Sequence, residues 1–130
     1  METEQTYEVE EHLTREFVES FGQLTGDINP LHMDKTFANE RGFSDQVVHG
    51  ALLTSIFSRI IGMHLPGKGA LIMKADSQFR APTLIEDRVT FKAEMTQWSE
   101  ATSTMVVEGE ARHSETGKLL ASFNYLVKLT

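Results

Sequence analysis

The first part of the chain carries apolar residues at helical spacing. Phe17, Phe21 and Leu24 recur at i, i+4 and i+7, which places them on one face of a helix. Thr14 stands just before this stretch, and its hydroxyl can accept a hydrogen bond from a free backbone N–H at the helix start. The pattern therefore predicts a short helix that begins after Thr14 and ends shortly after Leu24.

Two further helices are expected before residue 69. A short one from Asp34 to Arg41 would end at Gly42, and a longer one runs from about His49 to Met63. The longer segment is apolar over so much of its surface that we expect it to be buried. Its apolar stripe comprises Leu52, Leu53, Ile56, Phe57, Ile60 and Ile61. Its small-residue face comprises Ala51, Ser55, Ser58 and Gly62.

After residue 69 the helical spacing gives way to alternation of apolar and polar residues. One alternating segment has Val89, Phe91, Ala93 and Met95 on its apolar face. Another has Leu119, Ala121, Phe123, Tyr125, Val127 and Leu129. Breaks are expected at 80–82 and 86–87, a turn at 98–101 and a hairpin at 115–118. Long antiparallel strands with one buried face, preceded by one hydrophobic helix, predict an α+β fold whose sheet wraps around that helix.

Composition fits a single small domain. A chain of 130 residues with 40% hydrophobic content can bury a core but has no room for a second domain, so we expect one domain over residues 1–130. No apolar run approaches 18 residues and the polar start lacks a signal-peptide pattern, so neither membrane insertion nor export is expected. With no cysteine, disulfides and thiolate chemistry are excluded, and the cytoplasm is the default location.

One short loop gathers groups suited to proton transfer. On a continuous helix Asp27 and His32 would lie about 140° apart, on different faces. Pro30 fixes its own φ and pushes Asn29 towards extended conformations, so the segment must leave helical geometry and turn. Gly26 can end the preceding helix with a positive φ, and Asn29 can hold the bend by bonding nearby backbone. Taken singly these are ordinary turn residues, but together they can make an acid and an imidazole converge.

The whole string matches a known pattern, with an aromatic residue followed by Leu24, Thr25, Gly26, Asp27, Asn29, Pro30, Leu31, His32 and Ala38. This resembles the MaoC-like (R)-specific enoyl-CoA hydratases, which have the hot-dog fold. The resemblance continues at Val48-His49-Gly50, at Ser58 and at residues 65–69, so it covers the chain from about residue 16 onward. The sequence departs from the pattern at Glu86, where many relatives have glycine before the aspartate, and at Arg59 beside Ser58.

The resemblance implies a water-adding reaction on an α,β-unsaturated thioester. Asp27 would be the principal base that takes a proton from water, and His32 would orient the water and share the proton transfer to C2. Gly50, at the start of the buried helix, would offer a backbone N–H to the developing enolate oxygen. Asn29 would support the loop, and Ser58 would line the pocket or bond the pair. The same enzyme would also run the reverse dehydration.

His49 stands beside Gly50 at the expected start of the buried helix. We expect His49 to act as a structural hydrogen-bond donor at the helix start. Asp27, His32 and His49 could in principle hold a metal, but no H-x-H or H-E-x-x-H spacing is present, so no metal is expected. Neither a G-x-G-x-x-G motif nor a P-loop occurs, so no nucleotide cofactor is expected and the coenzyme A thioester is substrate only.

The sequence leaves three functional classes open. The first is the hydratase just described. The second is a different enzyme of the same fold, a thioesterase or a dehydratase with its carboxylate on the buried helix, although residues 50–63 contain no Asp or Glu. The third is a non-catalytic domain that only binds acyl thioesters. The substrate could be carried on coenzyme A or on an acyl carrier protein, and family resemblance implies a homodimer or an assembly of dimers.

The net charge of −7 bears on which anionic partners the protein can bind. Nucleic acid binding requires a basic face, and the sequence has no cluster of Lys or Arg, so no nucleic acid partner is expected. An anionic acyl-CoA would need a local positive patch. Its candidate cations, each of which is otherwise an ordinary surface residue, are Lys35, Arg41, Lys68, Lys74 and Arg80.

Overall fold

The structure of the protein is a computed structural model that describes residues 5–130. Within these residues, five strands and four helices follow one another, with a long helix placed before the last four strands. The strands are β1 (Thr6–His12), β2 (Ala70–Phe79), β3 (Arg88–Ser99), β4 (Thr104–His113) and β5 (Leu119–Leu129). The helices are α1 (Arg15–Thr25), α2 (Pro30–Met33), α3 (Lys35–Glu40) and α4 (Gly50–Met63).

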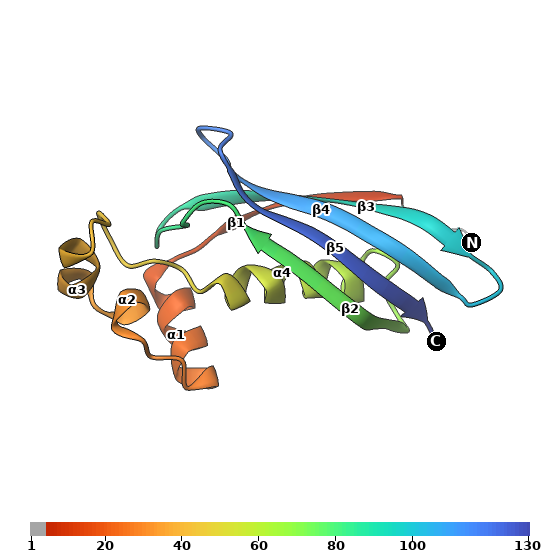
Figure 1. The fold of residues 1–130 in the computed structure, drawn as a ribbon, viewed down its shortest axis with the longest axis horizontal. Helices are drawn as coiled ribbons and strands as arrows, with labels where there is room; N and C mark the ends of the chain where they lie inside the picture. Colours follow the sequence, from red (N-terminus) through yellow and green to blue (C-terminus); the bar gives the residue numbers. More distant parts are fainter. Residues whose placement is uncertain (1–4) are drawn as a thin grey trace.

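The strands form one antiparallel sheet in the order β1-β3-β4-β5-β2. Helix α4 runs along one face of this sheet, and α1, α2 and α3 gather around the N-terminal end of α4 (Figure 1). The predicted apolar stripe of α4 is buried against the inward faces of β3, β4 and β5. Gly109 on β4 leaves no room for a Cβ atom because Phe57 packs directly against its backbone. The predicted α+β hot-dog architecture is confirmed.

The predicted ends of the helices are confirmed as well. The Thr14 hydroxyl accepts a hydrogen bond from the Phe17 N–H at 3.1 Å and caps α1. Gly26 ends α1 with φ 80°, the left-handed conformation that glycine adopts at low cost. The Asp34 carboxylate accepts from two backbone N–H groups and caps α3. The buried helix begins at Gly50, one residue from the expected start.

The expectation of only helices before residue 69 was wrong, because Thr6–His12 forms the edge strand β1 beside β3. Tyr7 and Val9 pack partly against the core, while Glu8 and Glu10 are exposed. An edge strand buries little of its inner face, so two apolar residues among several glutamates suffice to form it. The high charge of this segment hid a strand alternation that is present in the sequence.

The predicted turn at 98–101 was also misplaced. Strand β3 continues through Trp98 to Ser99, and the turn follows at residues 100–103, where Ser103 has φ 54°. Trp98 packs partly against the core. This contact favours strand geometry at Trp98, and the turn begins only after Ser99.

Glu86, which departs from the family pattern, adopts φ 71°, a conformation that normally favours glycine. Its carboxylate accepts a hydrogen bond from the Arg15 N–H at 2.8 Å and lies 3.0 Å from Nε2 of His12. Arg15 is the first residue of α1, so this side chain satisfies a backbone donor that glycine would leave to water. In the described residues, no helix is long and apolar enough to span a membrane.

Candidate active site

The loop between α1 and α2 turns the chain as expected. Gly26 ends α1, and the side chain of Asn29 accepts a hydrogen bond from the Leu31 N–H at 3.0 Å, which caps α2. Pro30 is the first residue of α2, where its missing N–H costs nothing. His32 therefore lies on a separate one-turn helix and not on a continuation of α1.

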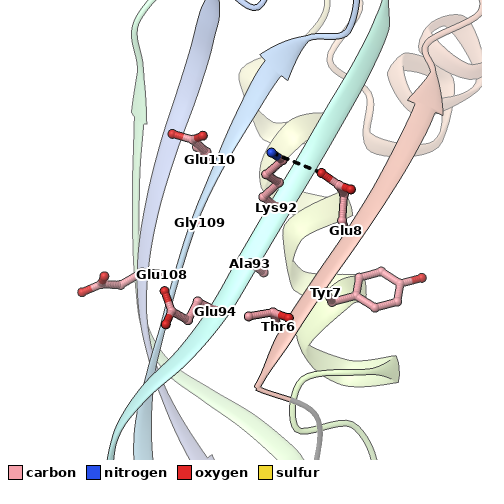
Figure 2. Close-up of a pocket in the computed structure, with 9 residues that line it drawn as sticks. All are labelled: Thr6, Tyr7, Glu8, Lys92, Ala93, Glu94, Glu108, Gly109 and Glu110. Atoms are coloured by element: carbon pink, nitrogen blue, oxygen red, sulfur yellow. Dashed lines mark ion pairs between the residues drawn. The ribbon is translucent and has the colours of Figure 1, made fainter.

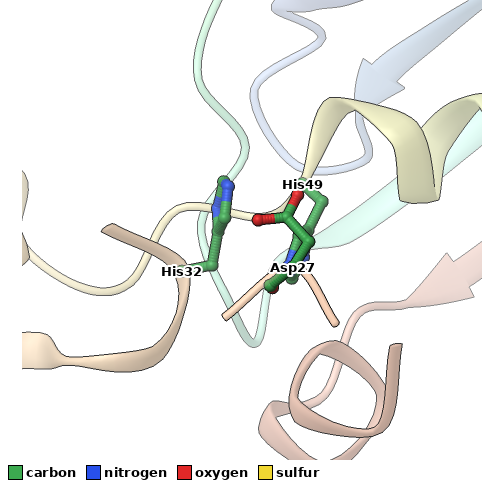
Figure 3. Close-up of side chains that lie close together, drawn as sticks. All are labelled: Asp27, His32 and His49. Atoms are coloured by element: carbon green, nitrogen blue, oxygen red, sulfur yellow. The ribbon is translucent and has the colours of Figure 1, made fainter. Parts of the chain in front are cut away.

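This turn brings Asp27 and His32 together, with His49 beside them (Figure 3). One side-chain atom from each of the three residues lies within 4.8 Å of the others. The rings of His32 and His49 stack with centroids 3.9 Å apart and an interplanar angle of 25°. A water held by two hydrogen bonds of about 2.8 Å each spans up to about 5 Å. The separation in this cluster therefore suits groups that share one water molecule.

Residues 46–49, which we call the strap, hold the loop in place. Nδ1 of His32 lies 2.7 Å from the Val47 carbonyl oxygen, and Nε2 of His49 lies 2.9 Å from the Asp27 carbonyl oxygen. The Gln46 side chain donates to the His32 carbonyl oxygen at 2.7 Å. Both members of the Asp27–His32 pair are thus fixed by the strap, which leads directly into Gly50 and α4.

The base of the strap is itself held from α1. Gln46 is only 2% exposed, and its side-chain oxygen accepts a hydrogen bond from the guanidinium of Arg15. The same guanidinium lies 3.7 Å from the Asp45 carboxylate. Both ends of the buried Gln46 amide are therefore paired, and α1 is linked through it to the backbone of His32.

The hydrogen bonds of the strap also assign the ring protons. A carbonyl oxygen only accepts, so Nδ1 of His32 and Nε2 of His49 each carry a hydrogen. This leaves Nε2 of His32 to exchange a proton with other molecules. Nδ1 of His49 is buried without a hydrogen-bond partner among the described residues, and the ring packs between His32 and Phe21.

The same cluster is poorly arranged for a metal ion. A ligating imidazole directs its lone pair within the plane of its ring. Because the rings of His32 and His49 are stacked, their lone-pair directions run side by side and do not converge on one ion. One nitrogen of each ring is also engaged by a backbone carbonyl. Without a rotation of one ring, the three groups suit acid–base chemistry better than metal binding.

A cavity of about 370 Å³ lies between His32 and the start of α4, and neither Asp27 nor His49 is among the residues that line it. Gly50 is the first residue of α4, so its backbone N–H has no partner within the helix. Helix dipoles favour negative charge at this end. The cavity is lined by His32, Val47, Val48, Gly50, Leu53 and the segment from Phe79 to Thr83.

The chain does not bring every expected residue to this cavity. Ser58 follows Gly50 by eight residues, which at 1.5 Å per residue is about 12 Å along the helix axis. It is half-buried and is not among the residues that line the cavity. Asn29 is exposed and acts on the loop backbone, as the sequence suggested.

Two residues at the site were not foreseen from the sequence. Gln46 holds the backbone of His32, and Phe79 lines the cavity beside Gly50. A single glutamine before Val47 has no motif that distinguishes it from a surface residue. Phe79 ends an edge strand far from the loop in sequence, so only the fold brings it to Gly50.

A larger groove of about 760 Å³ lies elsewhere, on the outer face of β1, β3 and β4 (Figure 2). Its charged residues are four glutamates and one lysine, and Lys92 pairs with Glu8 at 3.3 Å. Near its edge, a hydrogen bond from Arg112 lowers the pKa of Glu110 and raises that of Arg112. This acidic surface is unsuited to an anionic thioester, so the smaller cavity at Gly50 is the candidate active site.

The fold and this cavity define a hot-dog domain with an acid–imidazole pair at the start of its buried helix. The model of the MaoC-like domain family matches residues 1–118. The chain belongs to this family.

Several characterised proteins are similar in sequence. The chain is 42% identical to an (R)-specific enoyl-CoA hydratase of Aeromonas caviae over 79 residues, which are 61% of this chain and 59% of that protein. It is 38% identical over 74 residues to a mitochondrial 3-hydroxyacyl-[acyl-carrier-protein] dehydratase of Arabidopsis thaliana, covering 57% and 43% of the two chains. The chain thus spans about half the length of the curated relatives it matches.

Solved structures match over a greater length. An (R)-hydratase from A. caviae involved in PHA biosynthesis has a TM-score of 0.91 at 32% identity, covering 100% of this chain and 98% of that one. An R-hydratase from Pseudomonas aeruginosa in the unliganded form has a TM-score of 0.89 at 21% identity, covering 99% and 82%. The second similarity concerns the fold alone.

Proposed function

We propose that the protein catalyses (R)-specific hydration of trans-2-enoyl-CoA to (R)-3-hydroxyacyl-CoA, together with the reverse dehydration. The observation that carries this proposal is the convergence of Asp27 and His32, together with the cavity that His32 shares with Gly50 at the start of the buried helix. The hydratase and dehydratase names of the similar proteins support the same reaction class.

In the proposed mechanism, Asp27 and His32 hold one water between them. The Asp27 carboxylate accepts a proton as the water oxygen bonds to C3 of the enoyl thioester. A protonated His32 supplies the proton required at C2 from Nε2, since Nδ1 is engaged by Val47. The proton held by Asp27 then passes to Nε2 of His32, so both side chains return to their starting states. The oxygen added to C3 and the hydrogen added to C2 both derive from water over the full cycle.

Gly50 would stabilise the charge that develops during this addition. As the water oxygen bonds to C3, electrons move to the thioester oxygen and form an enolate. A preorganised backbone N–H directed at that oxygen lowers the barrier, because the donor needs no reorientation at the moment of reaction. The unpaired N–H groups at the start of α4 supply such donors.

Among the candidate cations, Arg80 is the one placed to bind the phosphates of the thioester substrate. It lines the cavity together with His32 and Gly50, whereas the other candidate cations are not among the lining residues. Its Nε donates to the Ser122 hydroxyl at 3.2 Å, so the outer nitrogens of the guanidinium remain to meet a phosphate. In a protein of net charge −7, one cation at the mouth would attract an anionic thioester locally.

The test is a spectrophotometric assay of trans-2-enoyl-CoA loss. Product would be coupled to an (R)-specific or an (S)-specific 3-hydroxyacyl-CoA dehydrogenase to read the stereochemistry. Asp27→Asn and His32→Gln should each lower kcat by about 10² to 10⁴-fold while the circular dichroism spectrum stays unchanged. Near wild-type turnover in either variant would refute the role given to that residue.

The alternative substrate is an (R)-3-hydroxyacyl group on an acyl carrier protein. Two of the similar proteins are named as 3-hydroxyacyl-[acyl-carrier-protein] dehydratases. Turnover of the carrier-protein thioester with none of the CoA ester would favour this alternative. Binding of both thioesters without turnover of either would indicate a non-catalytic acyl-thioester binding domain.

We also infer that the protein is a homodimer, or an assembly of dimers, through the free edge of β2. Strand β2 is at the end of the sheet and pairs only with β5 in the described part of the chain. Leu71 is 50% exposed and Met73 is 56% exposed on this strand. An edge that combines unpaired backbone groups with exposed apolar side chains is suited to pairing with a second copy.

A further inference from the structure

Phe79 lies directly against Gly50. A methyl group added at the Gly50 Cα would lie 2.9 Å from Cζ and 3.0 Å from Cε2 of the Phe79 ring. A contact of 2.9 Å is shorter than real Cβ atoms show, so the ring or the backbone would have to shift to admit the methyl group. The ring tip therefore fills the space that a side chain at residue 50 would need.

The position of Phe79 indicates a role in the cavity and not in the core. It is the last residue of the edge strand β2, and it is 52% exposed although it is large and apolar. It lines the same cavity as His32 and Leu53. A half-exposed aromatic ring contributes less to folding than a buried one, but here it forms one wall of the cavity at Gly50.

We propose that Phe79 determines which enoyl thioesters the site accepts by excluding a substituent at C2. This inference rests on the proposed hydratase function. If the Gly50 N–H holds the thioester oxygen, the carbonyl carbon lies next to residue 50. Because C2 is bonded to that carbon, a methyl group on C2 would extend from the same point, where the ring of Phe79 narrows the cavity.

The experiment compares kcat/KM for trans-2-butenoyl-CoA and for its 2-methyl derivative. Wild type should prefer the unbranched thioester strongly. Phe79→Ala should reduce this preference by about 10- to 200-fold, the range that one methyl-sized group is worth in a pocket. Phe79→Leu, which disturbs the strand less, should give an intermediate preference.

Gln78→Ala is the matched control, because Gln78 is the exposed neighbour on β2 and does not line the cavity. It should leave the preference unchanged. An active wild type with the same preference as Phe79→Ala would overturn the role of Phe79 alone. A wild type inactive on the unbranched thioester would instead refute the proposed function, so the two failures are distinguishable.

A double-mutant cycle tests the contact itself. Gly50→Ala keeps the backbone N–H but introduces the methyl group that meets the ring. In wild type this substitution should lower kcat/KM, and in the Phe79→Ala background most of that loss should be recovered, since residues in contact are not additive. Equal losses in the two backgrounds would overturn the proposed contact between residue 50 and the ring.

Discussion

His49 joins the two proposed catalytic side chains, although the reaction gives it no proton to transfer. Its ring nitrogen tethers the backbone of Asp27, and its ring supports the ring of His32 from behind. At 1% exposure it is fully enclosed. A single buried imidazole thus fixes the distance between the carboxylate and the other imidazole.

Two substitutions separate these contributions. His49→Phe keeps an aromatic ring but removes the donor to Asp27, and His49→Gln keeps an amide donor but removes the ring. We expect His49→Phe to lower kcat by up to about 10²-fold, the loss that a displacement of about 1 Å can cause, with a smaller change in KM. His49→Gln should retain more activity. Steady-state kinetics at matched folded fractions measures both, and wild-type kcat in His49→Phe would contradict the tether.

Individual residues were foreseen only where the local sequence determined them. The sequence predicted that Asp27 and His32 lie close together, because Gly26 ends the helix before Asp27 and Pro30 forces a turn before His32. Phe79 could not, since nothing near it in sequence indicates a neighbour at Gly50. The family pattern indicated Ser58, but this residue lies further along α4 and does not line the cavity.

Among the elements, the strap connects α1, α2 and α4. Gln46→Met keeps the length of the side chain but leaves the His32 carbonyl and the Arg15 guanidinium without this partner. We expect a loss of about 1–3 kcal/mol in the free energy of unfolding and a lower kcat, because the backbone of His32 loses its support. Urea denaturation and kinetics measure the two effects.

Gln23→Met is the control for that substitution. Gln23 is exposed on α1, so the same chemical change there should alter stability by no more than about 0.5 kcal/mol. If Gln46→Met were as stable and as active as Gln23→Met, the strap would not depend on its buried amide.

The hairpin between β4 and β5 carries a pH-dependent contact. Arg112 donates two hydrogen bonds to the Glu110 carboxylate, at 2.7 and 3.2 Å, and a third to the Gly117 carbonyl oxygen. These bonds lower the pKa of Glu110 in the folded protein. A depressed carboxyl pKa contributes stability above the unfolded value of about 4.3, and this stability is lost as pH falls through the folded pKa.

The wild-type Tm should therefore exceed that of Glu110→Gln by a few degrees at most near pH 7, since Glu110 is partly exposed and screened by water. The difference should close as pH falls below about 4. Differential scanning calorimetry across this range measures it. A difference that grew towards acid pH would contradict the assignment.

In the whole molecule, the proposed dimer depends on the exposed edge of β2. Met73→Glu places a charge among the exposed apolar residues of this edge while removing little buried surface, as Met73 is 56% exposed. We expect the variant to shift from dimer to monomer in size-exclusion chromatography with light scattering at micromolar concentration. Lys118→Glu, an exposed charge change in the β4–β5 turn, should leave the mass unchanged. A monomeric wild type would count against the dimer itself.

The overall architecture was more predictable than its edges. The long alternating segments of β3 and β5 and the apolar stripe of α4 each bury a continuous face, so their patterns are strong. Strand β1 buries only part of Tyr7 and Val9 and was missed. Burial of one face requires apolar residues at alternate positions, so an edge strand with little burial shows only a weak alternation in its sequence.

The sheet order has a consequence for the protein as it is synthesised. β5 is the last strand of the sheet to be made, yet it lies between β4 and β2 and is the only partner of β2 in the described residues. The residues from Asp27 to Gly50 leave the ribosome well before β5. Until residues 119–129 emerge, β2 has no strand to pair with, and part of the face that will cover α4 is missing. Phe57, which contacts Phe123 and Tyr125 of β5, therefore lacks these partners until late in translation.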